Sequence, residues 1–380
     1  MIYAVLTLLL AFTATMIGIP FAKKYLLASA IYGIDQQKQH KPKLPTSGGV
    51  VVFFSFITAI TFYVGSKSLF SSANVDEALV LAALASVNII TLIGLIDDIH
   101  IDFQKLLKEE LDAEQVESIQ IHEKVEYIQG RGEMMVKDLW HKIPGAEDKE
   151  TDGEHRQGLS QLPKMLFVLP AAFPLIAVGA GSWSMRIPVI GLQIHWGLIY
   201  PLILLPLGLL FVANVVNMLA GTNGLSTVLS FITSTGLAAF AAMNGEMEAM
   251  IIAASLSAAL LAFYFYNRYP ASILPGDSLT YLCGAGMFSA MVIGNMEKFG
   301  ATVFVLWFVE FGLKARSRFN AKSWGRVQED KSLRPHSEEI YSLTHIFMRK
   351  GFNEKQITEM LALIQALIVS GALILYTVFI

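Results

Sequence analysis

The stretch PLILLPLGLLFVANVVNMLAGTNGLS, residues 201–226, combines two kinds of sequence that rarely adjoin. Its first half, up to Ala213, is apolar enough for the interior of a lipid bilayer, whereas its second half has three asparagines and two glycines where the next apolar stretch begins. Because a bilayer core about 30 Å thick requires about 20 apolar residues per helix, this composition predicts a membrane helix that ends at a polar site.

The whole chain has the composition of a membrane protein. Of its 380 residues, 54% are hydrophobic and 16% are charged, and its mean hydropathy is +0.53, which excludes an ordinary soluble globular protein. The chain lacks the ten-residue alternating segments of an outer-membrane barrel, so we expect an all-α polytopic membrane protein. The one cysteine, Cys283, cannot form an internal disulfide, and the net charge of −3 gives no indication of a nucleic-acid partner.

The apolar runs predict about ten transmembrane helices, near 2–22, 48–66, 78–96, 162–181, 197–213, 225–243, 249–266, 278–294, 299–313 and 357–379. The loops between them alternate sides of the membrane. One set carries only Lys67, Arg186 and Lys298, and the other carries the remaining 25 of the 28 basic residues. By the positive-inside rule we expect the basic loops in the cytoplasm and both termini outside, in the cell membrane if the source is prokaryotic.

This count divides the chain into five segments. Residues 1–102 hold the first three helices and the cytoplasmic loop 23–47, 103–158 form a soluble cytoplasmic insertion, 159–313 hold helices four to nine, 314–356 form a cytoplasmic loop, and 357–380 form the last helix. The insertion carries 14 acidic against 8 basic residues, which is typical of a solvated segment.

The unusual polar residues of the chain all fall on the predicted cytoplasmic side. They come from five distant stretches and comprise Asp97, Asp98, Asn214, Asn217, Asp277, Arg316, Arg318 and His345. Carboxylates beside hydrocarbon are costly and call for a cation or a functional use. Paired carboxylates with substrate phosphates are typical of Mg²⁺ sites, and arginines suit a diphosphate. Together these residues predict one Mg²⁺–diphosphate site at the membrane surface.

Each signal taken alone has an ordinary structural interpretation. Asp277 in LPGDSLTY also suits a helix N-terminus, and Arg316 and Arg318 also suit the flank of a membrane helix. Lys43, in the segment HKPKLPTSGG at 40–49, suits either an anion-binding loop or a basic linker, and Lys164 could simply extend its ammonium towards the membrane surface. Lone histidines such as His336 and His345 are often packing residues.

The motifs NVVNMLAGTNGLS, GLIDD and PGDS resemble those of the polyprenyl-phosphate N-acetylhexosamine-1-phosphate transferases, and further similar segments extend over nearly the whole chain. The form LAGTNG is most similar to the eukaryotic and archaeal branch, which makes dolichyl-diphosphate-GlcNAc. The segment LTHIFMRKGF is similar to the final loop of the bacterial phospho-N-acetylmuramoyl-pentapeptide translocase.

The resemblance implies a role for each matching residue. Asn217 and Asp277 would hold Mg²⁺, with Mn²⁺ as an acceptable substitute, and Asp98, supported by Asp97, would handle the acceptor phosphate. The groups near the phosphates would be Lys164 and Asn214, and His345 would belong to the same catalytic set. The substrate-binding residues would be Lys43, Gly221, Asn223 and Leu225, the last three around uracil, together with Arg316 and Arg318 for the diphosphate or sugar.

Four positions depart from the family pattern. Ile101 stands where the pattern has an acid or amide, and the next carboxylate is Asp102. A histidine cluster of the bacterial enzyme is reduced to His345, Leu274 replaces an aromatic residue near uracil, and the spacing from Lys164 to the following proline differs.

The implied reaction is transfer of GlcNAc 1-phosphate from UDP-GlcNAc to a polyprenyl phosphate of the dolichyl type, by direct displacement or through a covalent aspartyl intermediate. This would be the first membrane step in assembling lipid-linked oligosaccharides for protein N-glycosylation or another surface glycan. Another UDP-N-acetylhexosamine, or UDP-MurNAc-pentapeptide with undecaprenyl phosphate, is an alternative substrate pair. The implied partners are therefore the nucleotide sugar, the lipid and the bilayer, and the resemblance also allows a homodimer.

A nucleotide-sugar transporter would use similar residues. Transport predicts functional polar residues near the middle of the membrane, whereas these residues cluster at one face.

Overall fold

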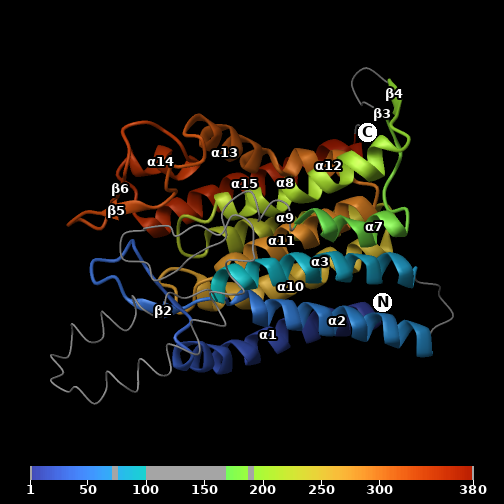
Figure 1. Cartoon of the computed structure of the whole chain (residues 1–380), viewed down its shortest axis with the longest axis horizontal. Helices are drawn as coiled ribbons and strands as arrows, with labels where there is room; N and C mark the ends of the chain where they lie inside the picture. The colour runs from blue at the N-terminus through green and yellow to red at the C-terminus, as the bar shows by residue number, and fades with distance from the viewer. Residues whose placement is uncertain (1, 71–75, 100–167, 187–191, 379–380) are drawn as a thin grey trace, which may run out of the picture.

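The computed structural model describes residues 2–70, 76–99, 168–186 and 192–378, which form a bundle of long helices running alongside one another (Figure 1). Within these described ranges, seven helical segments are long and apolar enough to cross a membrane: α1 (Ile2–Ala28), α2 (Gly49–Phe70), α3 (Glu77–Ile99), α8 (Leu205–Met218) with the π-helical turn Tyr200–Leu204 before it, α9 (Leu225–Met243), α10 (Met247–Asn267) and α15 (Glu354–Val378). The chain is therefore a multi-pass membrane protein, and the predicted all-α class is confirmed.

The other three predicted membrane helices are not among these seven segments. Helix α11 (Gly276–Ile293) is a regular helix of 18 residues that begins with the polar Gly276 and Asp277. The predicted helix 299–313 is divided at Phe304 into α12 (Glu297–Val303) and α13 (Val305–Arg316). The described part of 162–181 contains a 3₁₀ turn, η1 (Leu169–Ala172), and α7 (Phe173–Ala177), each with a proline at its start. The count of ten crossings therefore stays a prediction.

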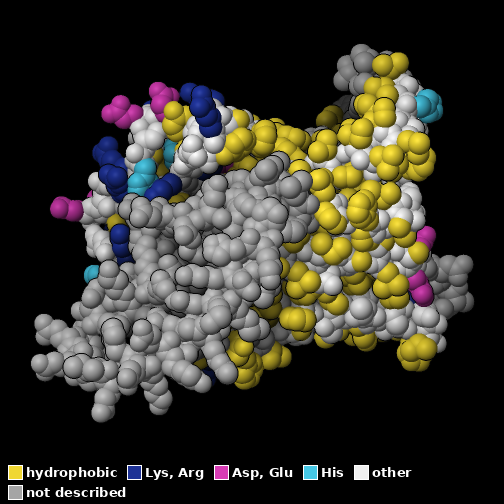
Figure 2. Space-filling model, viewed as in Figure 1, with side chains coloured by type: hydrophobic (Ala, Val, Ile, Leu, Met, Phe, Trp, Pro, Cys, Tyr) yellow, Lys and Arg dark blue, Asp and Glu magenta, His cyan; other side chains and the backbone are white. Residues whose placement is uncertain are grey.

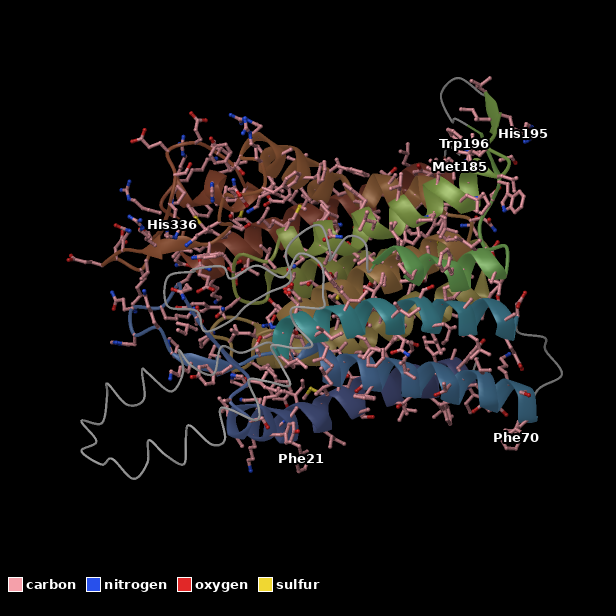
Figure 3. All side chains as sticks on the ribbon, viewed as in Figure 1. Phe21, Phe70, Met185, His195, Trp196 and His336 are labelled. Carbon is pink, nitrogen blue, oxygen red and sulfur yellow. The ribbon has the colours of Figure 1, made fainter. Side chains whose placement is uncertain are left out.

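Short hairpins mark the two ends of the bundle. At one end lie β1 (Tyr32–Ile34) paired with β2 (Lys43–Pro45), β5 (Gly325–Val327) paired with β6 (Leu333–Pro335), and α14 (Leu343–Met348). At the other end lie β3 (Ser184–Arg186) and β4 (Gln193–His195), and the start of α1 and the end of α15 lie at this same end of the bundle (Figure 1). We call these the loop end and the hairpin end; in Figure 3, His336 marks the first and His195 the second.

Charge and hydrophobicity divide along the same axis. Figure 2 shows most of the visible Lys, Arg and His side chains at the loop end and a continuous apolar surface over the remaining bundle. Large apolar side chains such as Phe54, Leu207 and Leu367 are more than half exposed on this surface. Such an extensive apolar surface is suited to lipid and unsuited to water.

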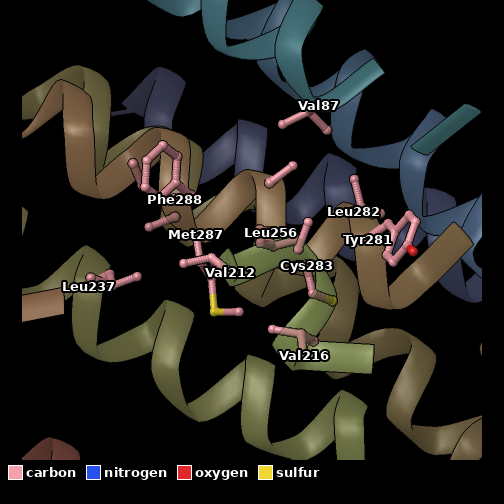
Figure 4. Packing of buried hydrophobic residues seen from close by; sticks show 14 of the residues in the cluster. Val87, Val212, Val216, Leu237, Leu256, Tyr281, Leu282, Cys283, Met287 and Phe288 are labelled. Carbon is pink, nitrogen blue, oxygen red and sulfur yellow. The ribbon is translucent and has the colours of Figure 1, made fainter. Parts of the chain in front are cut away.

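Helix α11 occupies the centre of the bundle, where it packs against α2, α3, α8, α9 and α10 (Figure 4). Glycines allow the closest of these contacts. A Cβ atom at Gly284 would lie 2.6 Å from the Cα of Ala213 on α8, and one at Gly94 on α3 would lie 2.7 Å from the carbonyl oxygen of Asp277. The ends of α3, α8 and α11 are therefore held together at the loop end.

Candidate active site

The last turn of α3 caps the first turn of α11. Asp98 is only 3% exposed, and its two carboxylate oxygens accept hydrogen bonds from the backbone N–H groups of Asp277 (2.7 Å) and Ser278 (3.1 Å). The first N–H groups of a helix have no partner within the helix, and a carboxylate is a favourable acceptor for them. Asp98 therefore fixes the start of α11 relative to α3.

Glycines let the surrounding backbone approach this junction. Gly276 has a φ of +71°, and a Cβ atom there would lie 2.2 Å from Oδ2 of Asp98. The Gly48 N–H donates to the Leu274 carbonyl, and the Leu274 N–H donates to the Pro45 carbonyl. A Cβ atom at Gly49 would lie 2.2 Å from a backbone nitrogen of α11. The segments PTSGG and LPGD thus interlock around the start of α11.

The two asparagines of α8 lie beside the same helix. Tyr281, one turn beyond Asp277 on α11, donates from its hydroxyl to Oδ1 of Asn214 at 3.4 Å, and Asn214 Nδ2 donates to the Leu210 carbonyl at 2.8 Å. Asn217 follows Asn214 by three residues and therefore shares its face of α8. We call this set the helix-end cluster: Asp98, Asp277, Tyr281, Asn214 and Asn217.

The helix-end cluster suits a magnesium ion that is bound together with phosphate. Within the described ranges there is no group of three or more His, Cys, Asp or Glu side chains that would enclose a metal by themselves. Asp277 and Asn217 supply a carboxylate and an amide oxygen, which are hard donors, and Mg²⁺ is typically held by one or two such groups while phosphates and water complete its shell. The residues present therefore fit the predicted ion.

The loop between α8 and α9 borders a second feature, a cavity of about 170 Å³ that we call the loop cavity. Its lining includes Gly221, Asn223, Leu274, Pro275 and Trp324. Gly221 is required by close packing, because a Cβ atom there would lie 2.5 Å from the Ser323 carbonyl oxygen. Since Pro275 directly precedes Gly276, the loop cavity adjoins the helix-end cluster.

Buried charges support the wall of the loop cavity. The Asn223 N–H donates to Oε1 of Glu354 at 2.7 Å, and Glu354 forms an ion pair with Lys38, which also pairs with Asp35 at 3.2 Å. Gln37 donates a hydrogen bond to the Gly221 carbonyl. These supporting residues come from the β1–β2 hairpin and the first turn of α15.

A third feature is a basic cavity of about 400 Å³ that shares Gln36 and Trp324 with the loop cavity. Its charged lining residues are Lys38, Lys41, Lys322, Arg326 and His336. Burial and the neighbouring charges of Arg326 and Lys322 lower the pKa of His336, so its imidazole is held towards the neutral form. Since Lys38 is already paired with Asp35 and Glu354, it is Lys41, Lys322 and Arg326 that make this cavity suitable for an anion.

The sequence of this chain is similar to those of known proteins. Residues 146–295 match the model of the family described as glycosyl transferase family 4. The chain is 28% identical over 376 residues to a protein of Saccharolobus solfataricus that is provisionally named UDP-N-acetylglucosamine–dolichyl-phosphate N-acetylglucosaminephosphotransferase, with 98% of this chain and 96% of the relative covered. Residues 146–295 thus resemble glycosyl transferase family 4. The family resemblance predicted from the motifs is thereby confirmed.

Two further relatives differ in how much of this chain they match. A Sulfolobus acidocaldarius protein with the same provisional name is 26% identical, again over 98% of this chain and 96% of its own length. A phospho-N-acetylmuramoyl-pentapeptide-transferase of Clostridium perfringens is 27% identical over 165 residues, which are 40% of this chain and 49% of the relative. The similarity to the first kind of relative therefore extends over the full chain, whereas the similarity to the second is partial.

Several residues assigned by family resemblance lie apart from the contacts described above. Arg316 is exposed and pairs with Glu339 at 3.4 Å, Arg318 is exposed with a φ of +52°, and the exposed Lys43 donates to the Tyr32 hydroxyl. None of these three lines the loop cavity or the basic cavity. Leu225 is fully buried at the start of α9 and lines neither.

His345 is built into the loop end as a buried side chain, 1% exposed. Its Nδ1 accepts a hydrogen bond from the Tyr341 N–H at 3.4 Å, so its Nε2 carries the proton donated to the Lys322 carbonyl at 2.8 Å. Burial is the main cause that lowers its pKa. The neutral ring thus links α14 to the wall of the basic cavity.

Asp97, which the family resemblance pairs with Asp98, is partly exposed one residue before it on α3. Lys164 and the predicted insertion 103–158 lie outside the described residues. Four residues that support the loop-cavity wall belong to no motif of the sequence: Asp35, Gln37, Lys38 and Glu354. Nothing in the sequence distinguishes them from other polar residues in a loop or at the start of a helix, so their contacts could not be predicted.

Proposed function

We propose that this chain transfers N-acetylglucosamine 1-phosphate from UDP-N-acetylglucosamine to a dolichyl-type polyprenyl phosphate, with UMP as the second product. The observation that carries the proposal is that a pocket of nucleobase size directly adjoins a cluster of carboxylate and amide groups at the ends of membrane helices. The full-length similarity to relatives named for this reaction supports it. The product would be the first lipid-linked sugar of an N-glycan or another surface glycan.

In the proposed reaction, a phosphate oxygen of the lipid attacks the phosphorus atom that carries the sugar. A new P–O bond forms there, the bond to the bridging oxygen breaks, and that oxygen leaves with UMP. The acceptor phosphate has a second pKa of about 6 and is largely ionised at neutral pH, so the step requires no strong base. The protein must instead position the two phosphates and neutralise their charge.

The helix-end cluster can meet these needs. Asp277 and Asn217 would hold Mg²⁺, which supplies Lewis-acid stabilisation of the diphosphate when bound. Asp98 orients the first turn of α11 through two backbone hydrogen bonds. Because both oxygens of Asp98 are already engaged, the geometry favours direct displacement over a covalent aspartyl intermediate at this residue.

The membrane position follows from the solubility of the two substrates. The nucleotide sugar is soluble and the lipid tail is not, so their phosphates can meet only at a membrane surface. We assign the loop end, with its basic hairpins, to the cytoplasmic side. The start of α1 and the end of α15 lie at the opposite end and would therefore be outside (Figure 1).

The test is UMP release by purified full-length protein in detergent with Mg²⁺, a polyprenyl phosphate and a panel of UDP-sugars. We expect lipid-dependent release with UDP-GlcNAc, lost on addition of EDTA and reduced about a thousandfold in Asp98→Asn and Asp277→Asn. The exposed Asp330 on the β5–β6 turn provides a matched control, and Asp330→Asn should retain wild-type activity.

The panel also separates the alternatives. Release from UDP-MurNAc-pentapeptide and not from UDP-GlcNAc would replace the proposed donor. A protein that binds UDP-sugars and releases UMP from none of them would refute the transferase and favour nucleotide-sugar transport.

A further inference from the structure

The side-chain amide of Asn223 is held in one orientation. Its Oδ1 accepts hydrogen bonds from Lys38 Nζ at 3.1 Å and from the Ala271 backbone N–H at 3.0 Å. Both groups are donors only, which identifies the accepting atom as oxygen and not nitrogen. Asn223 lines the loop cavity and also a neighbouring cavity beside Tyr264 and Arg268. Among the described residues no hydrogen bond of its Nδ2 donor is seen, so this donor can serve a ligand in the loop cavity.

Lys38 is itself fixed on several sides. It pairs with Asp35 and with Glu354, and its Nζ lies 4.4 Å from the centroid of the Tyr269 ring. The two carboxylates are almost fully buried, so their negative charges require this cation. Lys38 thus has little freedom to leave Asn223.

Glu354 fixes the backbone of the same residue. It accepts a hydrogen bond from the Asn223 N–H, and Thr358, one turn later on α15, donates from its hydroxyl to the Asn223 carbonyl at 3.1 Å. Thr358 also bonds to the Thr222 hydroxyl at 2.8 Å. The main chain and the side chain of Asn223 are therefore both determined by one network that joins β1–β2 to α15.

We propose that Lys38 and Glu354 are positioning residues that make this site select uracil over cytosine, by holding the Asn223 amide with its N–H₂ group towards the base. The proposal rests on the proposed function, which places a uridine nucleotide at this site. Uracil has a carbonyl acceptor at the position where cytosine has an amino donor. The Nδ2 donor pairs with the first, whereas with the second two donors would meet and both would lose their hydrogen bonds.

The orientation can be tested by isothermal titration calorimetry of UMP and CMP on the purified full-length protein. This experiment reads binding alone and does not depend on turnover. The wild type should bind UMP at least about 100-fold more tightly than CMP. Lys38→Met should reduce this ratio about tenfold, because one of the two hydrogen bonds that orient the amide is lost.

A second variant protects the test against misfolding. Lys38→Met leaves two buried carboxylates without their cation, whereas Lys38→Met/Glu354→Gln removes one charge of each sign and keeps an acceptor for the Asn223 N–H. The ratio should fall by a similar factor in this double variant. Lys350→Met, at an exposed lysine before α15, is the matched control and should leave the ratio unchanged.

Asn223→Asp gives the most direct reversal. It replaces the Nδ2 donor with an acceptor, so UMP binding should weaken and CMP should become the preferred nucleotide. An unchanged ratio in the folded double variant, or a preference for UMP that persists in Asn223→Asp, would overturn the inference.

These outcomes are distinct from failure of the proposed function. Loss of the proposed function would appear as absent lipid-dependent UMP release in the wild type. Failure of the inference would appear as unchanged nucleotide preference in variants of a wild type that does release UMP.

Discussion

The helix-end cluster and the loop cavity adjoin each other but are built differently. In the cluster, helices α3, α11 and α8 bring Asp98, Asp277 and Asn214 together, and backbone hydrogen bonds and close glycine contacts set their positions. At the loop cavity, the wall consists of loop backbone tied to distant segments by Lys38 and Glu354. The helix-end cluster is thus positioned by backbone hydrogen bonds and steric contact, whereas the wall of the loop cavity is positioned by buried charges.

The difference has a physical consequence. Steric contacts between backbones cannot relax without moving whole helices, so an added methyl group should disturb every residue of the cluster at once. A buried ion network is stable because its opposite charges neutralise one another. Removal of one member leaves an unpaired buried charge, and we expect this to disturb mainly the loop that carries it. Under the proposed function, substitutions in the helix-end cluster should therefore lower mainly the reaction rate. Substitutions in the wall of the loop cavity should weaken mainly the binding of the nucleotide.

Gly276→Ala should disrupt the helix-end cluster and have the largest effect on activity and stability. The new Cβ would lie 2.2 Å from Oδ2 of Asp98, on a residue whose φ of +71° disfavours any side chain. We expect UMP release to fall about 100-fold or more, with a loss of about 2 kcal/mol in stability. The two quantities are read from the UMP assay and from thermal unfolding in detergent.

Gly65→Ala is the matched control for this change. Gly65 lies on α2, and a Cβ atom there would meet no atom within 4 Å. Its activity and melting temperature should equal or slightly exceed those of the wild type, because alanine favours helix more than glycine does. Equal behaviour of the two variants would contradict the steric account of the helix-end cluster.

The sequence predicts regular apolar helices better than the irregular points between them. Long apolar runs have a local cause, so α2 and α10 occupy nearly the residues predicted for them. The division at Phe304 was not predicted, because the residues around it, from Val303 to Val309, are apolar throughout. The irregular start before α8 contains Pro201 and is followed by Pro206, and these two prolines within the predicted helix were the sequence signal for it.

The site shows the same limit. Asp277 alone has the sequence of a helix N-terminus, but the carboxylate that caps α11 is Asp98, which lies 179 residues earlier. Lys38 and Glu354 are 316 residues apart and neither belongs to a motif, so their ion pair could not be inferred from the sequence. The motifs predict which residues carry chemistry, and only the structure shows which other residues hold those residues in position.

His345→Gln, near the wall of the basic cavity, should have a smaller effect, which is a change in how stability depends on pH. The pKa of His345 is lowered, so the folded state favours the neutral ring, and its contribution is fully present above the ordinary pKa of about 6.5. As pH falls below that value, the unfolded state takes up a proton first and stability decreases. The melting temperature of the wild type should therefore drop by a few degrees more than that of His345→Gln between pH 8 and pH 5.5.

Glutamine can still donate to the Lys322 carbonyl and does not titrate, which makes it the suitable replacement. The charges facing His345 include Lys314 and Arg349, and these remain in both proteins. His195→Gln, at an exposed residue of the hairpin end, should leave the pH dependence of the wild type unchanged. Parallel pH profiles of the wild type and His345→Gln would contradict the buried neutral ring.

Tyr281→Phe should have the smallest effect, and it separates positioning by hydrogen bond from positioning by steric contact within the helix-end cluster. The Tyr281 hydroxyl reaches Asn214 at 3.4 Å, which is a long hydrogen bond and should contribute little. If glycine contacts set the cluster, removal of this hydroxyl should lower kcat by only about threefold and leave the KM for UDP-GlcNAc unchanged. Tyr266→Phe, which removes a hydroxyl bonded to the Met16 carbonyl elsewhere in the bundle, is the control. A loss as large as that of Gly276→Ala would mean that the hydroxyl, and not the helix packing, holds Asn214 in place.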